Sequence, residues 1–133
     1  MRSIAAACGL ALCLAAPATA ERNLVPTLDK EPSVCPEQPP EPEWMQNIEV
    51  RESYKRILVQ QIYRAESMQR IVDAQNCECA TRYPSWDAAE GVFLEHFAAA
   101  EYWDVVEATK EYRRQANELR KEAMPICEAV GNW

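Results

Sequence analysis

The chain has 133 residues, enough for one domain with an arm and too few for two catalytic domains. It contains 21 acidic and 14 basic residues, a net charge of -7, and no basic cluster, so a nucleic-acid-binding face is not expected. Three glycines, nine prolines and stretches rich in Ala, Glu, Arg and Gln favour helices with a proline-rich arm over a turn-dense β-sandwich.

The first twenty residues have the pattern of a secretory signal peptide. Arg2 precedes an apolar run from Ile4 to Ala16, and small residues follow it up to Ala20. This run is shorter than the roughly 20 residues of a membrane span, so a retained membrane anchor is the weaker interpretation. We expect cleavage after Ala20, export to the periplasm or the outside of the cell, and no stable membrane insertion of the mature chain.

Four cysteines remain after this cleavage: Cys35, Cys77, Cys79 and Cys127. In an oxidising compartment they predict two disulfides, for which three pairings are possible. A zinc site is the weaker alternative, because four exported cysteines more often pair with one another.

Residues 21–44 form the predicted arm. Six prolines lie between Pro26 and Pro42, a density that prevents helices and sheet ladders and favours extended polyproline backbone. Cys35 within this segment indicates that a disulfide ties the arm to the body. We therefore divide the chain into a signal peptide (1–20), an extended arm (21–44) and a helical domain (45–133).

An amphipathic helix is predicted from about Ile48 to Gln75, a stretch without glycine or proline. Its apolar stripe recurs at spacings of four and three and includes Tyr54, Leu58, Ala65, Met68 and Val72. Residues 76–84 are predicted as a loop, because Pro84 keeps the residue before it out of the helical region. Ser85 or Asp87 can cap the next helix, and Glu90 has capping-box spacing from Asp87.

Residues 86–124 carry two apolar stripes. The first is Trp86, Ala89, Phe93, Phe97 and Ala100, and the second is Val105, Thr109, Tyr112, Ala116, Leu119 and Ala123. The stripes are out of phase by roughly 100°, so a change is expected between Glu101 and Asp104. Either the helix breaks there, with Asp104 as a new N-cap, or one long helix presents two faces. Pro125 is expected to end the helical stretch.

The two alternatives predict different disulfides. With a break, the helices run up, down and up, and Cys35 and Cys127 each bond to one of Cys77 and Cys79. The arm has the required reach, since its polyproline span of about 46 Å exceeds the length of about 39 Å of the first helix. An unbroken helix would pair Cys35 with Cys127 and leave a strained Cys77–Cys79 bridge. We favour the first alternative. In both cases the fold class is all-α, a helical hairpin or three-helix arrangement stapled by two disulfides.

Catalytic chemistry has few candidate residues. The motif Cys77-Glu78-Cys79 is compatible with thiol–disulfide exchange, but it lacks the Cys-x-x-Cys spacing and strand–helix setting of thioredoxin-like enzymes, which favours a structural role. His96 is the single histidine, so a metal site built from several histidines is excluded. We expect no catalytic residue, no cofactor and no metal.

Aromatic residues near the predicted helix ends are the candidate partner contacts. They are Trp86, Tyr102, Trp103 and Trp133, with Trp44 and Tyr83 in similar positions. Such residues pack at the edge of a core or form an exposed docking patch, since Trp and Tyr dominate interface hot spots.

The segment NCECATRYPSWDAAE at residues 76–90, with Ile126-Cys127 and Gly131-Asn132-Trp133, resembles small exported proteins encoded among type IV secretion and conjugation genes of alphaproteobacteria. The resemblance spans about residues 76–133. It implies a periplasmic accessory component of a secretion or DNA-transfer apparatus and supplies no catalytic residues. The chain lacks the lipidated cysteine of the lipoproteins in such systems, which argues against direct anchoring in the outer membrane.

Together these observations predict a non-enzymatic periplasmic protein that acts through protein partners in the cell envelope, without nucleic acid or cofactor. The alternatives are a thiol–disulfide redox protein that uses Cys77 and Cys79, and a small inhibitor or chaperone-like binder.

Overall fold

The computed structural model describes Cys35 and residues 38–133. The predicted signal peptide and the rest of the arm lie outside the described residues. Within the described part the chain is all-helical, as predicted, and has no strand. No helix of this part is long and apolar enough to cross a membrane.

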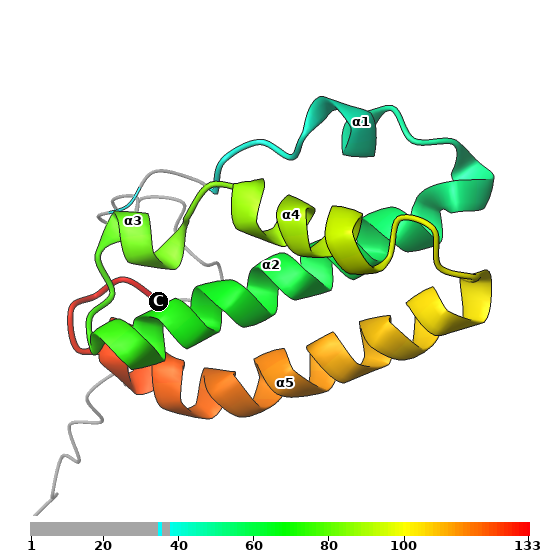
Figure 1. The fold of residues 1–133 in the computed structure, drawn as a ribbon. Coiled ribbons are helices and arrows are strands. Elements are labelled where there is room, and N and C mark those ends of the chain that lie inside the picture. The colour runs from blue at the N-terminus through cyan, green and yellow to red at the C-terminus, as the bar shows by residue number, and fades with distance from the viewer. Residues whose placement is uncertain (1–34, 36–37) are drawn as a thin grey trace, which may run out of the picture.

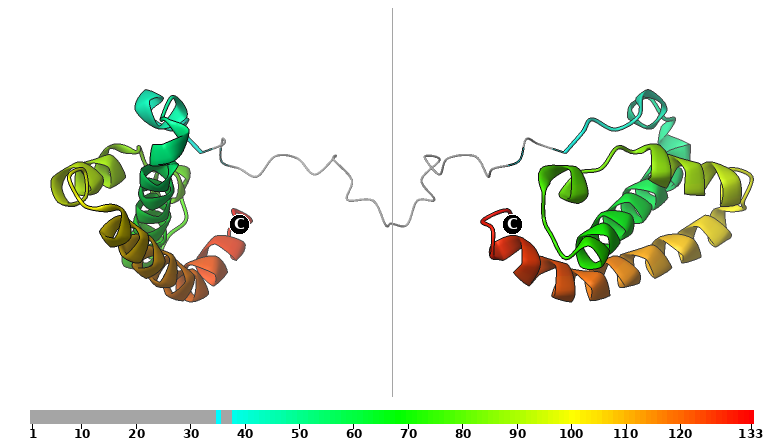
Figure 2. Two further views of the ribbon diagram at one scale, coloured as in Figure 1. Left: turned by 90° about the vertical axis from the view of Figure 1, so that its right-hand side faces the viewer. Right: turned by 60° about the vertical axis from the view of Figure 1, so that its left-hand side comes forward.

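Three longer helices and three single turns make up the described part of the molecule. In chain order they are α1 (Glu43–Gln46), the 3-10 turn η1 (Val50–Glu52), α2 (Ser53–Ala74), α3 (Cys79–Arg82), α4 (Asp87–His96) and α5 (Tyr102–Glu128). α2 is the central helix, because it contacts α3, α4 and α5. It runs between α5 on one side and α1 with α4 on the other (Figure 1, Figure 2).

The first long helix, α2, forms where the spacing of apolar residues predicts it. It begins at Ser53 rather than near Ile48, after the turn of η1, and its last residue is Ala74. Gln75 follows with a left-handed φ of 50°, and its side-chain amide donates to the Val72 carbonyl at 2.7 Å. Its buried apolar face consists of Leu58, Val59, Ile62, Tyr63, Ala65 and Ile71.

The predicted break in residues 86–124 is confirmed, since α4 ends at His96 and α5 begins at Tyr102. The predicted N-cap is wrong: Glu101 holds that position, without a side-chain cap, and Asp104 lies in the first turn of α5. A carboxylate there favours the helix through the macrodipole without capping it.

The capping box predicted for Asp87 and Glu90 is also absent. Trp86 is the N-cap of α4 and makes no side-chain cap, and Asp87 is the first helical residue. The Glu90 carboxylate instead accepts a hydrogen bond from Trp44 Nε1 at 2.5 Å. A tertiary contact thus uses the side chain that the local pattern assigned to the helix end.

Pro125 does not end α5, which continues to Glu128. A proline inside a helix costs about 3 kcal/mol, because it removes one backbone hydrogen bond and crowds the preceding turn. Pro125 lies on the exposed side, whereas Ala123 and Cys127, four residues apart, are fully buried on the other. Packing and the Cys127 disulfide therefore keep the last turn helical.

Two clusters of buried side chains hold the helices together. The larger joins α1, α2, α4 and α5 and contains Met45, Leu58, Val59, Ile62, Tyr63, Trp86, Ala89, Phe93 and Val105. The smaller lies at the other end of α2 and contains Ile71, Cys77, Ala123 and Cys127. Aromatic stacking reinforces the larger cluster, with ring centroids 4.0 Å apart for Tyr63 and Trp86 and 5.5 Å for Trp44 and Phe93.

The disulfides have the pairing that the three-helix alternative predicts. Cys35 is bonded to Cys79 and Cys77 to Cys127, with Cα–Cα distances of 5.1 and 5.0 Å. Residues 38–42 contain no helix or strand. Glu41 in this segment accepts hydrogen bonds from Arg56 and Gln60 of α2. The described end of the arm therefore doubles back along α2, as the reach of the chain allows.

A substitution at Met45 tests whether the short helix α1 packs as part of the core. Its side chain is 0 % exposed, so Met45→Ala should lower the free energy of unfolding by about 2–5 kcal/mol, the usual cost of truncating a buried methionine. Val50→Ala is the matched control, because Val50 is 88 % exposed and its truncation should be nearly neutral. Urea unfolding followed by circular dichroism measures both. Equal stability of the two variants would contradict the packing of α1.

Candidate functional site

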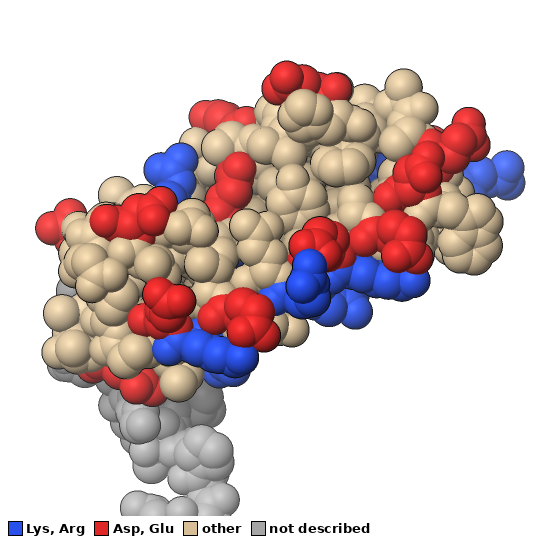
Figure 3. All heavy atoms as spheres, turned by 60° about the horizontal axis from the view of Figure 1, so that its bottom comes forward, with Lys and Arg blue, Asp and Glu red and all other residues tan. Residues whose placement is uncertain are grey.

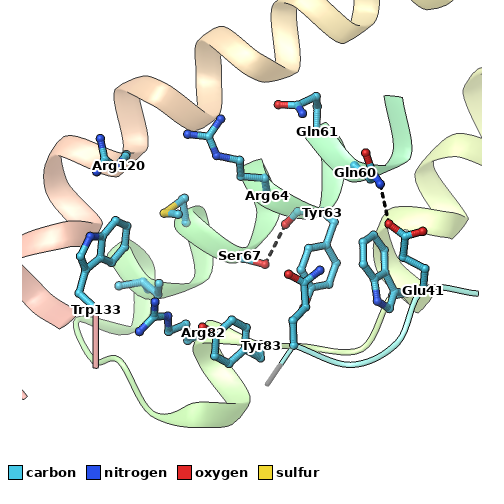
Figure 4. A pocket seen from close by; sticks show the side chains of 14 residues that line it. Glu41, Gln60, Gln61, Tyr63, Arg64, Ser67, Arg82, Tyr83, Arg120 and Trp133 are labelled. Atoms are coloured by element: carbon cyan, nitrogen blue, oxygen red, sulfur yellow. Dashed lines mark hydrogen bonds between the residues drawn. The ribbon is translucent and has the colours of Figure 1, made fainter. Parts of the chain in front are cut away.

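A groove of about 500 Å³ runs along α2, beside the described end of the arm (Figure 4). Its lining comes from residues 38–41, from α2, from residues 82–86, and from Arg120 and Trp133 near the C-terminal end of the chain. Three of the lining side chains are arginines: Arg64, Arg82 and Arg120. We call this feature the arginine groove.

Arg82, the last residue of α3, is held between aromatic rings. Its guanidinium lies 5.0 Å from the ring of Tyr83 and 5.4 Å from the ring of Trp133. The Nη1 atom is buried and has no hydrogen-bond partner among the described residues. Leaving a buried donor of a charged group unpaired is costly, so such an atom marks a place where a water or a ligand supplies the acceptor.

The other two arginines lie on the helices on either side. Arg120 of α5 is exposed, and its guanidinium lies 5.5 Å from the Trp133 ring, so this indole contacts both Arg82 and Arg120. Arg64 of α2 donates to the side-chain oxygen Oδ1 of Asn117 at 2.9 Å. Within the described part of the chain, none of the three forms an ion pair. The groove is therefore a positively charged region on the surface of an acidic protein.

Glu41 is the one acidic residue in the groove lining, and its charge is already compensated. Its carboxylate lies 2.7 Å from Arg56 Nη2 and accepts a further hydrogen bond from Gln60. Figure 4 shows Glu41 and Gln60 at the end of the groove away from Trp133 and Arg82. The two ends thus differ, since one carries a closed ion pair and the other carries arginines without a carboxylate.

Apolar and neutral polar groups complete the lining. Tyr63 is nearly fully buried, stacks on Trp86 and donates its hydroxyl proton to the Pro84 carbonyl at 2.8 Å. Burial raises the pKa of Tyr63 above its ordinary value, so the phenol stays neutral. Gln61 also lines the groove, and its Oε1 is buried without a hydrogen-bond partner among the described residues.

A second exposed feature lies at the start of α5. Tyr102 and Trp103 are 48 % and 71 % exposed. Tyr102 contacts Tyr54 of α2 and its neighbour Trp103 edge-to-face, with both ring centroids at 4.9 Å. We call Tyr54, Tyr102 and Trp103 the aromatic end.

The four aromatic residues predicted as partner contacts do not form one patch. Tyr102 and Trp103 lie together at the aromatic end, whereas Trp133 lies in the arginine groove, beside Arg120 and about 25 Å further along α5. Trp86 is buried in the core, and its Nε1 donates to the Pro39 carbonyl at 2.9 Å. Tyr102 and Trp103 are therefore the two of these four residues that form an exposed pair for a partner to contact.

The three arginines of the groove were not among the candidate residues predicted from the sequence. Arg64 and Arg120 lie in predicted helices, where an arginine has the pattern of an ordinary solvated position, and Arg82 lies in the segment predicted as a loop, so no local pattern marks the three as neighbours.

The outer face of α5 shows what an ordinary solvated face looks like in this molecule. Figure 3 shows acidic and basic side chains alternating along it. They form exposed pairs three residues apart: Glu107 with Lys110, Glu111 with Arg114, and Glu118 with Lys121. Such pairs compensate one another locally and contribute little to stability.

The cysteines lie at the end of α2, mostly out of solvent. Cys35, Cys77 and Cys127 are buried, and Cys79 is partly exposed. The Asn132 amide donates to Cys35 Sγ at 2.7 Å and to the Cys77 carbonyl at 2.6 Å. Exchange requires that an attacking thiolate reach a sulfur atom, and this burial restricts such access.

Other candidate chemistry is sparse. His96 is exposed, and its closest acidic group is Glu95, with Nε2 at 3.7 Å from the carboxylate. Among the described residues no three His, Cys, Asp or Glu side chains gather in a way that could hold a metal ion. Neither protein-family models, nor curated proteins, nor solved structures show a match to this chain.

The disulfides generate a test of their role. We expect peptide mapping without reduction to recover Cys35–Cys79 and Cys77–Cys127. Replacing Cys77 and Cys127 by Ser opens a loop with ends 50 residues apart, and should lower the free energy of unfolding by about 2–5 kcal/mol.

The wild-type protein should not catalyse insulin reduction. Turnover of insulin that is lost in a Cys79→Ser variant of unchanged fold would instead establish exchange chemistry.

Proposed function

We propose that this protein is a non-enzymatic interaction component of the cell envelope, which binds a protein partner through the aromatic end. From the resemblance of residues 76–133 we further propose that the partner belongs to a type IV secretion or conjugation apparatus. The periplasm is the compartment that we propose, because the predicted signal peptide directs export and two disulfides are typical of oxidising compartments.

One observation carries the proposal: the exposure of Trp103 in a fixed setting. A side chain this apolar is 71 % exposed although the large cluster of buried side chains lies nearby on α2 and α5. Its neighbour Tyr102 is braced edge-to-face against Tyr54, so the pair is held in place before a partner arrives. Aromatic residues of this kind contribute most to binding at interfaces, and a fixed conformation reduces the entropy lost on association.

The burial of three of the four cysteines supports a structural role for the disulfides over the redox alternative. A small inhibitor or chaperone-like binder would use the same exposed aromatic pair, so identifying the partner is what separates these interaction functions.

Complementation tests the proposal in a strain that carries the gene beside type IV secretion genes. Deleting the gene should lower conjugative transfer, and the wild-type gene should restore it. Trp103→Ala with Tyr102→Ala should fail to restore transfer, because the exposed aromatic area is lost while the buried core is unchanged. Leu94→Ala on α4, also an exposed apolar residue at 58 %, is the matched control and should restore transfer.

Immunoblots of the periplasmic fraction establish that all variants accumulate equally. Unchanged transfer after deletion would contradict the type IV secretion role. Full restoration by the double aromatic variant would contradict the role of the aromatic end.

A further inference from the structure

The arginine groove has the charge of a binding site in a molecule whose overall charge is opposite. The chain has a net charge of -7, yet Arg64, Arg82 and Arg120 line one groove and form no ion pair within the described part of the chain. Outside the groove, five Lys and Arg side chains of the described part form ion pairs, and three arginines at other surface positions, Arg51, Arg70 and Arg113, do not. The groove therefore attracts an anionic group that the described chain does not supply.

Arg82 has the geometry to bind such a group. Contacts with the rings of Tyr83 and Trp133 orient its guanidinium, and the buried Nη1 lacks an acceptor among the described residues. A guanidinium presents its N–H groups as a planar fork that matches a carboxylate, and charge-assisted hydrogen bonds of this kind are strong. Arg120 also contacts the Trp133 ring and is a second cation at this end of the groove.

The neutral part of the lining favours a peptide over a small inorganic anion. Gln61 contributes a side-chain amide to the lining, a group that can both donate and accept hydrogen bonds. Inorganic phosphate mainly offers acceptors, whereas a peptide offers carboxylate and carbonyl acceptors together with backbone N–H donors. Apolar side chains of Met68 and Ile71 in the lining suit the carbon atoms of a peptide.

The chain itself provides a precedent for this mode of binding. Residues 38–42 lie along α2 without helix or strand, and the Glu41 carboxylate meets Arg56 and Gln60 at one end of the groove. An extended segment with an acidic side chain thus already binds to α2. The end with Arg82 and Arg120 presents cations without the carboxylate.

We propose that the arginine groove binds an extended acidic peptide segment of another protein, whose carboxylates are bound by Arg82 and Arg120. This site is separate from the aromatic end, because Trp103 and Arg120 are about 25 Å apart along α5. The proposal therefore does not depend on the function proposed for Tyr102 and Trp103.

Fluorescence anisotropy tests the proposal with a fluorescein-labelled hexaglutamate peptide and the protein with both disulfides formed. Binding should saturate and weaken with added salt, because the attraction is between charges. Arg120→Gln should weaken binding by about tenfold, the effect of losing a charge-assisted contact. Arg82→Gln should weaken it at least as much. Arg113→Gln, a substitution on the exposed surface of α5 outside the groove lining, removes the same charge and should leave the affinity unchanged.

Competition and fold controls separate the other outcomes. Unlabelled hexaglutamate should displace the probe, and hexaglutamine should not. Arg120 is exposed, so the Arg120→Gln variant reports on binding even if Arg82→Gln reduces the stability of the fold.

The proposal would be overturned if the peptide did not bind, or if the Arg113 and Arg120 variants lost the same affinity. Displacement by inorganic phosphate as effective as by hexaglutamate would overturn the peptide assignment. Binding gained only after Glu37→Gln would mean that the chain's own arm competes for the groove, which would also overturn it.

Discussion

The arrangement of this protein depends on two disulfides that meet at one end of α2. Cys77 and Cys79 are two residues apart, and they hold Cys35 of the arm and Cys127 of α5. The sequence separations of 44 and 50 residues mean that each bridge closes a long loop, which removes much of the unfolded chain's freedom. The two bridges thereby fix the extended segment and the parallel helices α2 and α5 relative to one another (Figure 1).

The same junction shapes the arginine groove. After α5 the chain turns at Gly131, whose φ of 70° is a conformation that glycine adopts without strain. Asn132 is buried against Cys35 and the Cys77 carbonyl, and the next residue, Trp133, then lies against Arg82 and Arg120. The disulfides thus position the C-terminal residues, and these residues position the guanidinium groups.

The molecule presents two unlike surfaces along α5. The aromatic end is apolar and braced by ring contacts, which suits a hydrophobic hot spot on a partner. The arginine groove is cationic, and its lining contains a buried donor and a buried acceptor without partners among the described residues, which suits a charged, hydrogen-bonding ligand. A partner that contacts both surfaces would gain from the effective concentration of the second site once the first is bound.

Local properties of the sequence determined the three longer helices and the break between α4 and α5, but not the single turns α1 and α3, which lie at the end of the predicted arm and in the predicted loop. Apolar spacing depends on residues three and four positions apart, so the phase shift near Glu101 was visible without a structure. The reach of the arm likewise favoured the observed pairing of Cys35 and Cys127 with the Cys77/Cys79 pair, because chain length bounds what a disulfide can join.

Tertiary structure decided what each side chain meets. It buried Trp86 against Pro39, gave Glu90 to Trp44 instead of to a cap, and carried α5 through Pro125 because Cys127 is anchored beyond it. It also gathered the three arginines of the groove from helices that are distant in sequence. No local pattern encodes such a meeting, because it arises only when the two disulfides and the central helix α2 bring these distant segments together.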